Sequence, residues 1–167
     1  MTDVELLFDG AALARSGAEA ITRLTEAATA ATFYRDGLTP EQVAANRRIV
    51  AISAGACAAA AASPDQRFGA AFVVGTLAGY VIATRHAPHD LELDWMMVDP
   101  AHHGGGVAPA LMEAGIGWLG TDRPLWLNVI AHNERAIRFY RRFGFEIDPD
   151  ARCDHVVPHA IMRRAAG

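Results

Sequence analysis

A strand, a glycine-rich loop and a helix follow one another in the middle of the sequence, and this succession constrains the fold most. An apolar run at residues 91–98, typical of a buried strand, is followed by His103-Gly104-Gly105-Gly106. Apolar residues then recur at helical spacing over residues 107–120. A strand needs partner strands, and an amphipathic helix needs an apolar surface to cover. The segment therefore requires a sheet with helices packed on it.

The rest of the sequence predicts further strands and helices around this unit. Apolar runs predict strands at residues 4–8, 68–74, 77–84, 125–131, 145–147 and 156–162, and helical spacing predicts helices at 11–32, 39–63 and 133–143. Gly75-Thr76 joins the second and third runs as a hairpin, and Thr39-Pro40-Glu41-Gln42 is typical of a helix start. We expect residues 1–167 to form one domain, an α/β (α+β) fold with about four helices around a mixed, mostly antiparallel central sheet.

Composition limits the classes of partner and compartment. Of the 167 residues, 51% are hydrophobic and 20% are charged, which is typical of a globular core. The formal net charge of −4 speaks against nucleic acid as the main partner. The longest apolar stretch, residues 49–62, is too short to span a bilayer, and the first five residues are acidic where a signal peptide is basic. Cys57 and Cys153 lie far apart and outside any CxxC pair, so we expect a reduced, cytoplasmic protein without membrane contact.

The glycine-rich loop has the features of an anion site. Glycines let backbone N–H groups approach a ligand closely, and a helix N-terminus carries unpaired donors and partial positive charge. The loop lacks both the Lys-Ser/Thr of a P-loop and the GxGxxG of dinucleotide folds. It therefore indicates either a site for a phosphate or pyrophosphate or a flexible surface loop.

A second unit decides between these interpretations. Asn133, Ala136, Phe139-Tyr140 and Gly144-Phe145 form the pattern N-x-x-A-x-x-F-Y-x-x-x-G-F. Here the sequence resembles the GNAT superfamily of acyl-CoA-dependent N-acyltransferases. The loop is then similar to the family's [R/Q]-x-x-G-x-[G/A] motif, with a histidine in the first position. The resemblance covers roughly residues 68–164.

The resemblance implies acetyl-CoA as co-substrate, with the pantetheine arm between splayed fourth and fifth strands. Backbone groups near Met97 and Val98 would pair with the pantetheine amides, the N–H groups of residues 104–108 would hold the pyrophosphate, and Asn133 would contact the arm. The full set of implied cofactor-binding residues is Met97, Val98, His103, Gly104, Gly105, Gly106, Val107, Ala108, Asn133 and Tyr140.

His103 is a departure from the family pattern. A neutral imidazole binds phosphate more weakly than a guanidinium, although the backbone donors remain. Four arginines of the following helix are either a source of charge for the ribose 3′-phosphate or a solvated helix face: Arg135, Arg138, Arg141 and Arg142.

The resemblance also implies direct attack of an amine on the thioester in a ternary complex. Tyr140 stands where the family keeps a general acid for the departing thiolate, although its spacing also suits a packed aromatic. Glu92 stands where the family often keeps its base. Asp94 shares its strand face if the strand is regular, and a water chain is a further alternative. Either carboxylate could instead be an exposed strand residue or an ion-pair partner.

The acceptor has no motif, and we expect a small-molecule or peptide amine. Residues 33–36, Phe-Tyr-Arg-Asp, lie where the family covers the acceptor side of the cleft, although Phe33 and Tyr34 could instead anchor two helices. Dimers are common in such families, so a homodimer is possible.

Two other functions compete with an acetyltransferase. One is an acyl-CoA-binding module without efficient turnover, which His103 and the unsettled base keep open. The other is a metal protein, because two histidine pairs, His86/His89 and His155/His159, have metal-ligand spacing. Pro88 and Pro158 should keep each pair apart, so we expect no metal.

Overall fold

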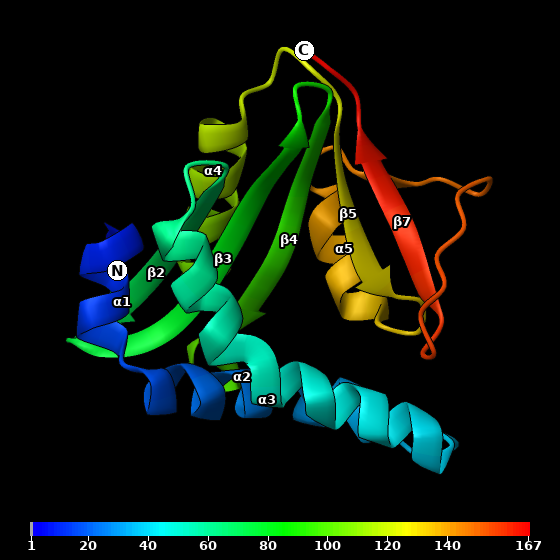
Figure 1. Ribbon diagram of the computed structural model, residues 1–167, viewed down its shortest axis with the longest axis horizontal. Coiled ribbons are helices and arrows are strands. Elements are labelled where there is room, and N and C mark those ends of the chain that lie inside the picture. The colour runs from blue at the N-terminus through cyan, green and yellow to red at the C-terminus, as the bar shows by residue number, and fades with distance from the viewer. Residues whose placement is uncertain (1) are drawn as a thin grey trace.

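The computed structural model describes residues 2–167, and its centre is one seven-stranded sheet in the order β1-β2-β3-β4-β5-β7-β6 (Figure 1). The strands are β1 Val4–Phe8, β2 Gln66–Val73, β3 Thr76–Ala87, β4 Asp90–Val98, β5 Leu125–Ile130, β6 Glu146–Ile147 and β7 His159–Arg164. All neighbours pair antiparallel except β4 and β5, which are parallel. The expectation of a mixed, mostly antiparallel sheet is confirmed.

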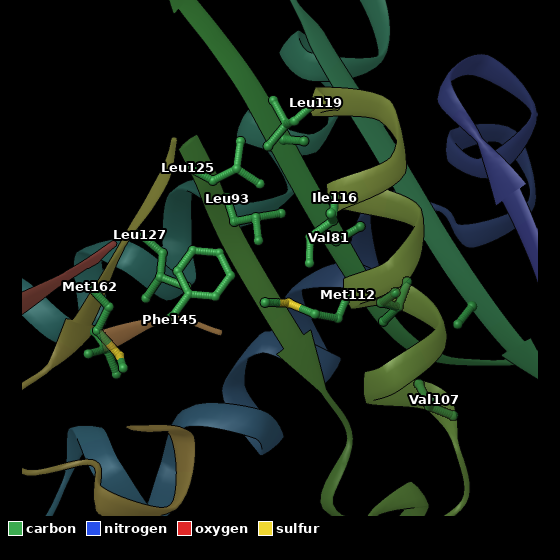
Figure 2. Close-up of a cluster of buried hydrophobic side chains, with 14 of the residues drawn as sticks. Val81, Leu93, Val107, Met112, Ile116, Leu119, Leu125, Leu127, Phe145 and Met162 are labelled. Carbon is green, nitrogen blue, oxygen red and sulfur yellow. The ribbon is translucent and has the colours of Figure 1, made fainter. Parts of the chain in front are cut away.

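Helices cover both faces of the sheet. They are α1 Asp9–Ser16, α2 Ala18–Phe33, α3 Pro40–Ala62, α4 Val107–Leu119 and α5 Glu134–Arg141, and a single 3₁₀ turn, η1, spans Pro100–His102. Residues of α1, α2 and α3 share one buried cluster with one sheet face, and those of α4 and α5 share another with the opposite face. In Figure 2, Met112 and Ile116 of α4 lie against Val81 and Leu93 of the sheet.

The single helix predicted at residues 11–32 is wrong in one respect. The structure has two helices, α1 and α2, that meet at Gly17, whose φ of 75° lies in the left-handed region. A right-handed helix cannot continue through such a residue, and glycine adopts it without steric cost. Alanine-rich periodicity runs across this glycine, so the pattern alone did not reveal the break.

Two other helix starts follow from local hydrogen bonds. The Thr39 side chain accepts from the backbone N–H of Gln42 at 3.1 Å, and the Gln42 side chain accepts from the Thr39 N–H at 3.0 Å. This is the capping box expected from the sequence. At α5, Asn133 Oδ1 accepts from the Ala136 N–H at 3.2 Å. Each cap satisfies a donor that a helix end leaves free.

Gly115 lets α4 lie close to the sheet, and we predict that an alanine there destabilises the fold. A Cβ at Gly115 would lie 2.6 Å from Leu93 Cδ2, whereas a Cβ at Gly117 in the same helix would meet nothing within 4 Å. Gly117→Ala should stabilise by about 0.5–1 kcal/mol through helix propensity. The free energy of unfolding of Gly115→Ala should be about 1–3 kcal/mol lower than that of the control, because the core around Leu93 must shift to admit the methyl group. Urea unfolding of both variants measures the difference, and equal stabilities would contradict it.

Candidate active site

The strands β4 and β5 separate immediately after they meet. Glu92 and Trp126 are their one pair in the ladder, although β4 pairs with β3 and β5 pairs with β7 along most of their lengths. Figure 1 shows the two strands diverging, with α5 behind the gap. The facing edges of β4 and β5 beyond Glu92 therefore carry backbone N–H and C=O groups without strand partners. This confirms the predicted splay of the fourth and fifth strands. Such groups require hydrogen bonds from water or a ligand.

The strand β4 is not regular, which corrects the assumption used for Asp94. Ile82 pairs with Trp95 and Ala83 pairs with Leu93, so Asp94 has no partner residue in β3. This is a β-bulge, which bends a strand and re-aims its side chains. The Asp94 carboxylate accepts a hydrogen bond from Thr84 Oγ1 at 3.2 Å.

The glycine-rich loop is open to a ligand. Gly104 and Gly106 have φ angles of 79° and 85°, and a Cβ at either would meet nothing within 4 Å. Gly106 is the N-cap of α4, where no side chain caps the helix. The first backbone N–H groups of α4 therefore remain available to an anion. A pocket of about 280 Å³ lies beside the loop, lined by Thr2, Val73, Ala101, His102, His103, Gly104, Gly105 and Val107.

Arg135 is the arginine of α5 that lies nearest the loop. Burial lowers the pKa of His103, and the positive charge of Arg135 lowers it further, so the imidazole is neutral at pH 7. The other three arginines have structural partners: Arg138 lies 3.7 Å from Glu134, Arg141 lies 3.4 Å from Glu146, and Arg142 lies over the Phe139 ring. Of the four arginines, Arg135 is therefore the one without an ion-pair or cation–π partner among residues 2–167.

Glu92 is buried in the sheet rather than exposed. It is 5% exposed, and its Oε2 lies 2.6 Å from Nε2 of His86. Burial and then the negative charge of Asp94 raise the pKa of Glu92 to about 7, against the opposing effect of His86. A carboxyl group with a pKa near the working pH is suited to accept and release a proton.

Tyr140 combines a packed ring with a free hydroxyl. Its ring lies 5.6 Å from that of Phe139 and 6.4 Å from that of Phe145. Burial raises the pKa of Tyr140 to about 12, so the phenol stays protonated at neutral pH. Among residues 2–167, no group hydrogen-bonds the hydroxyl. Tyr140 can therefore be both a packed aromatic residue and a candidate general acid.

Asn128 is a site candidate that the sequence did not reveal. It lies on β5, two residues after Trp126 and hence on the same strand face. Its Oδ1 is buried and has no hydrogen-bond partner in the described part of the chain. A buried polar atom without a partner is costly, which is typical of a ligand-binding position. A lone polar residue within an apolar strand was the available signal.

The acceptor-side residues separate into two kinds. Phe33 is 7% exposed and packs with Val50, Ile130 and Val157, so it anchors the helix pair. Tyr34 is 38% exposed. Only Tyr34 of this aromatic pair is available to an acceptor.

The expectation that Pro158 separates His155 from His159 is wrong. Their ring centroids lie 4.2 Å apart, because residues 151–158 form an irregular loop that turns back before β7. Across residues 2–167 there is no group of three or more His, Cys, Asp or Glu side chains placed to hold a metal ion. None of the helices described here has the length and apolar character needed to cross a membrane.

Comparisons with known proteins identify sequence relatives and structures of similar fold. The pattern of the acetyltransferase (GNAT) family matches residues 19–145. An uncharacterised N-acetyltransferase of Mycobacterium tuberculosis is 37% identical over 76 residues, 44% of this chain and 49% of that protein. The chain thus spans about half the length of the curated relatives it matches.

Solved structures share the fold. The PaiA N-acetyltransferase of Thermoplasma acidophilum, in complex with coenzyme A, has a TM-score of 0.75 over 98% of this chain and 99% of that one, at 17% identity. Nourseothricin acetyltransferase has a TM-score of 0.52 and 29% identity, over 62% of this chain and 67% of that one.

Proposed function

The chain belongs to the GNAT acetyltransferase family, and from this premise we propose that it transfers the acetyl group of acetyl-CoA directly to an amine in a ternary complex. The observation that carries the proposal is the single ladder pair between Glu92 and Trp126. It leaves an open gap with free backbone groups, and a buried carboxylate stands where the gap begins. The uncapped start of α4 supplies anion donors beyond the end of β4.

The coenzyme would lie along this gap. Backbone groups of β4 at Met97 and Val98 would pair with the pantetheine amides. The N–H groups of Gly104, Gly106, Val107 and Ala108 would bind the pyrophosphate, with Arg135 adding positive charge. The Gly105 N–H is already donated to the His102 carbonyl at 3.2 Å. Asn133 would contact the arm through its amide NH₂, because its Oδ1 caps α5 and its backbone N–H and C=O are hydrogen-bonded to Ile130 and Ile137.

The chemistry then needs proton removal from the amine and proton delivery to the sulfur. A lysine-like amine has a pKa near 10.4, so its neutral form at pH 7 lies about 4.6 kcal/mol uphill. Glu92 takes the amine proton, and the nitrogen attacks the thioester carbon. The C–S bond breaks, and Tyr140 gives its proton to the departing sulfur. The second proton of the attacking nitrogen leaves as the amide forms and, through water, restores the phenol of Tyr140, so one proton in all passes to solvent. The pKa of Glu92, about 7, suits proton acceptance, and the raised pKa of Tyr140 keeps the phenol protonated until negative charge develops on the sulfur.

Turnover separates this proposal from a module that only binds acyl-CoA. Acetyl-CoA should raise the melting temperature, because a ligand of the folded state stabilises it by mass action. Release of free CoA is then measured with a panel of small amines and peptides. A response to CoA without turnover on any amine would favour the binding module, and no thermal response at millimolar acetyl-CoA would contradict both.

We predict that Gly106→Asp abolishes most CoA affinity with the fold intact. The new carboxylate would face the pyrophosphate at the start of α4, where the helix dipole favours the anion of the ligand. Gly37→Asp is the matched control, because Gly37 also has a positive φ, 90°, and open space around it. Calorimetry should show a loss of about tenfold or more for Gly106→Asp and little change for Gly37→Asp. Equal affinities would place the phosphates elsewhere.

A further inference from the structure

His86 connects the buried Glu92 carboxylate to the surface. The Nε2 atom of His86 lies 2.6 Å from Oε2 of Glu92, and their side chains are 41% and 7% exposed. Among residues 2–167, His86 is the one side chain that hydrogen-bonds Glu92. A base that is closed off from water in this way must pass its proton to a neighbour before it can act again.

The fold aims His86 at Glu92. The ladder between β3 and β4 shifts its register between Arg85 and Ala87, so His86 sits at an irregularity of β3. The imidazole also stacks on the Trp126 ring, with 6.0 Å between the ring centroids and an interplanar angle of 24°. The Trp126 indole N–H in turn donates to Asp90 Oδ1 at 2.6 Å. A strand irregularity and an aromatic surface thus fix the ring.

The charges around this imidazole favour its protonation. The ionisable groups that face it are three carboxylates of β4, namely Glu92, Asp90 and Asp94, and β5 contributes the uncharged Trp126. The hydrogen bond that the protonated ring donates to the Glu92 carboxylate is the main cause that raises the pKa of His86, and all three negative charges add to it. Arg85, its basic neighbour in the chain, is bound instead to the Trp118 carbonyl.

We propose that His86 relays to solvent the proton that Glu92 removes from the acceptor amine. This inference rests on the proposed acetyl transfer. The relay starts from the enzyme molecules in which the imidazole is neutral and Glu92 is ionised. The ammonium loses one proton to Glu92, and the proton crosses the short hydrogen bond to Nε2 of His86. The resulting imidazolium releases its Nδ1 proton to water or buffer, which restores the Glu92 carboxylate. Exchange with solvent returns the imidazole to its starting tautomer, so one proton enters and one leaves.

Chemical rescue tests the relay. His86→Ala should lower kcat by about tenfold or more. Added imidazole should restore much of it, because His86 is exposed enough for a small base to replace it. The restored rate should follow the pKa across a series of substituted imidazoles. His89→Ala removes an exposed histidine of the same hairpin and should show neither effect.

Two further measurements keep the test decisive. Glutamine at position 86 can still hydrogen-bond Glu92 but cannot take up and release a proton. His86→Gln should therefore have a lower kcat, while its melting temperature stays near that of the parent. By NMR, which needs no acceptor, the pKa of His86 should fall in Glu92→Gln.

Four outcomes would overturn the relay: full kcat in His86→Ala, a defect that imidazole does not restore, full kcat in His86→Gln, or an unchanged His86 pKa in Glu92→Gln. If the parent enzyme turns over and His86→Ala is equally fast, the relay is refuted but the proposed acetyl transfer is not. A parent that transfers no acetyl group to any amine refutes the proposed function.

Discussion

Replacing Tyr140 with phenylalanine should lower kcat by about 10²–10³ while CoA affinity stays nearly unchanged. The substitution removes one hydroxyl and keeps the ring that packs on Phe139 and Phe145. No protein group hydrogen-bonds that hydroxyl within the described residues, so the fold loses no internal bond. The missing interaction forms mainly in the transition state, when charge develops on the sulfur, and therefore appears in kcat rather than in binding.

Tyr80→Phe is the matched control for this experiment. The Tyr80 hydroxyl is buried on the opposite face of the sheet and lies 2.7 Å from Thr25 Oγ1. Its removal should cost about 0.5–1.5 kcal/mol of stability and leave kcat unchanged. Steady-state kinetics and calorimetry on both variants compare the two tyrosines. A Tyr140→Phe enzyme as fast as the parent would exclude the acid role.

Glu92→Gln should lower kcat most strongly near neutral pH, with a defect that shrinks as the pH rises. In the parent, kcat should rise through pH 7, because a raised pKa of about 7 keeps much of Glu92 protonated below that pH. In the variant this limb disappears. Its residual rate should increase toward the pKa of the amine, where the neutral acceptor no longer needs a base. The measurement is kcat against pH for both enzymes with one acceptor.

The same pKa shift predicts the sign of a stability change. The folded pKa of Glu92 exceeds its ordinary value of 4.5, so between pH 4.5 and 7 the native state binds more protons than the unfolded state. The stability that this group contributes therefore falls as the pH rises through this range, by on the order of 3 kcal/mol. Glu92→Gln should melt at or above the parent temperature at pH 8, which shows that lost activity is not lost folding.

Asp94→Asn separates the two carboxylates. If Glu92 is the base, Asp94→Asn should retain most of kcat and shift the pH limb to lower values, because a negative charge that raises the pKa of Glu92 is gone. A defect in Glu92→Gln that stays constant with pH would instead move the base to Asp94, to water or to the acceptor. The effects of Tyr140→Phe and Glu92→Gln need not add, since both groups serve one reaction.

The sequence predicted the parts of the site that depend on neighbours in the chain. The strand, the glycine loop and the start of α4 are consecutive, and their geometry follows from backbone preferences that the residues carry themselves. The Thr39–Gln42 capping box is of the same kind, because both hydrogen bonds close within three residues. The residue pattern from Asn133 to Phe145 indicated the family. Backbone preferences and helix caps by themselves do not indicate a family.

Contacts between distant segments decided the rest. The gap exists because β4 and β5 pair only at Glu92 and Trp126, while β3 and β7 hold their outer edges along most of their lengths, an arrangement that belongs to the whole sheet. Asp94 lies at a bulge that depends on the register with β3, and Glu92 has a raised pKa because the assembled core excludes water around it. Helical periodicity could not reveal the break at Gly17, and proline content could not reveal that His155 and His159 meet. Residue pattern fixes hydrogen bonds over three or four positions, whereas burial, register and loop closure are properties of the packed chain as a whole.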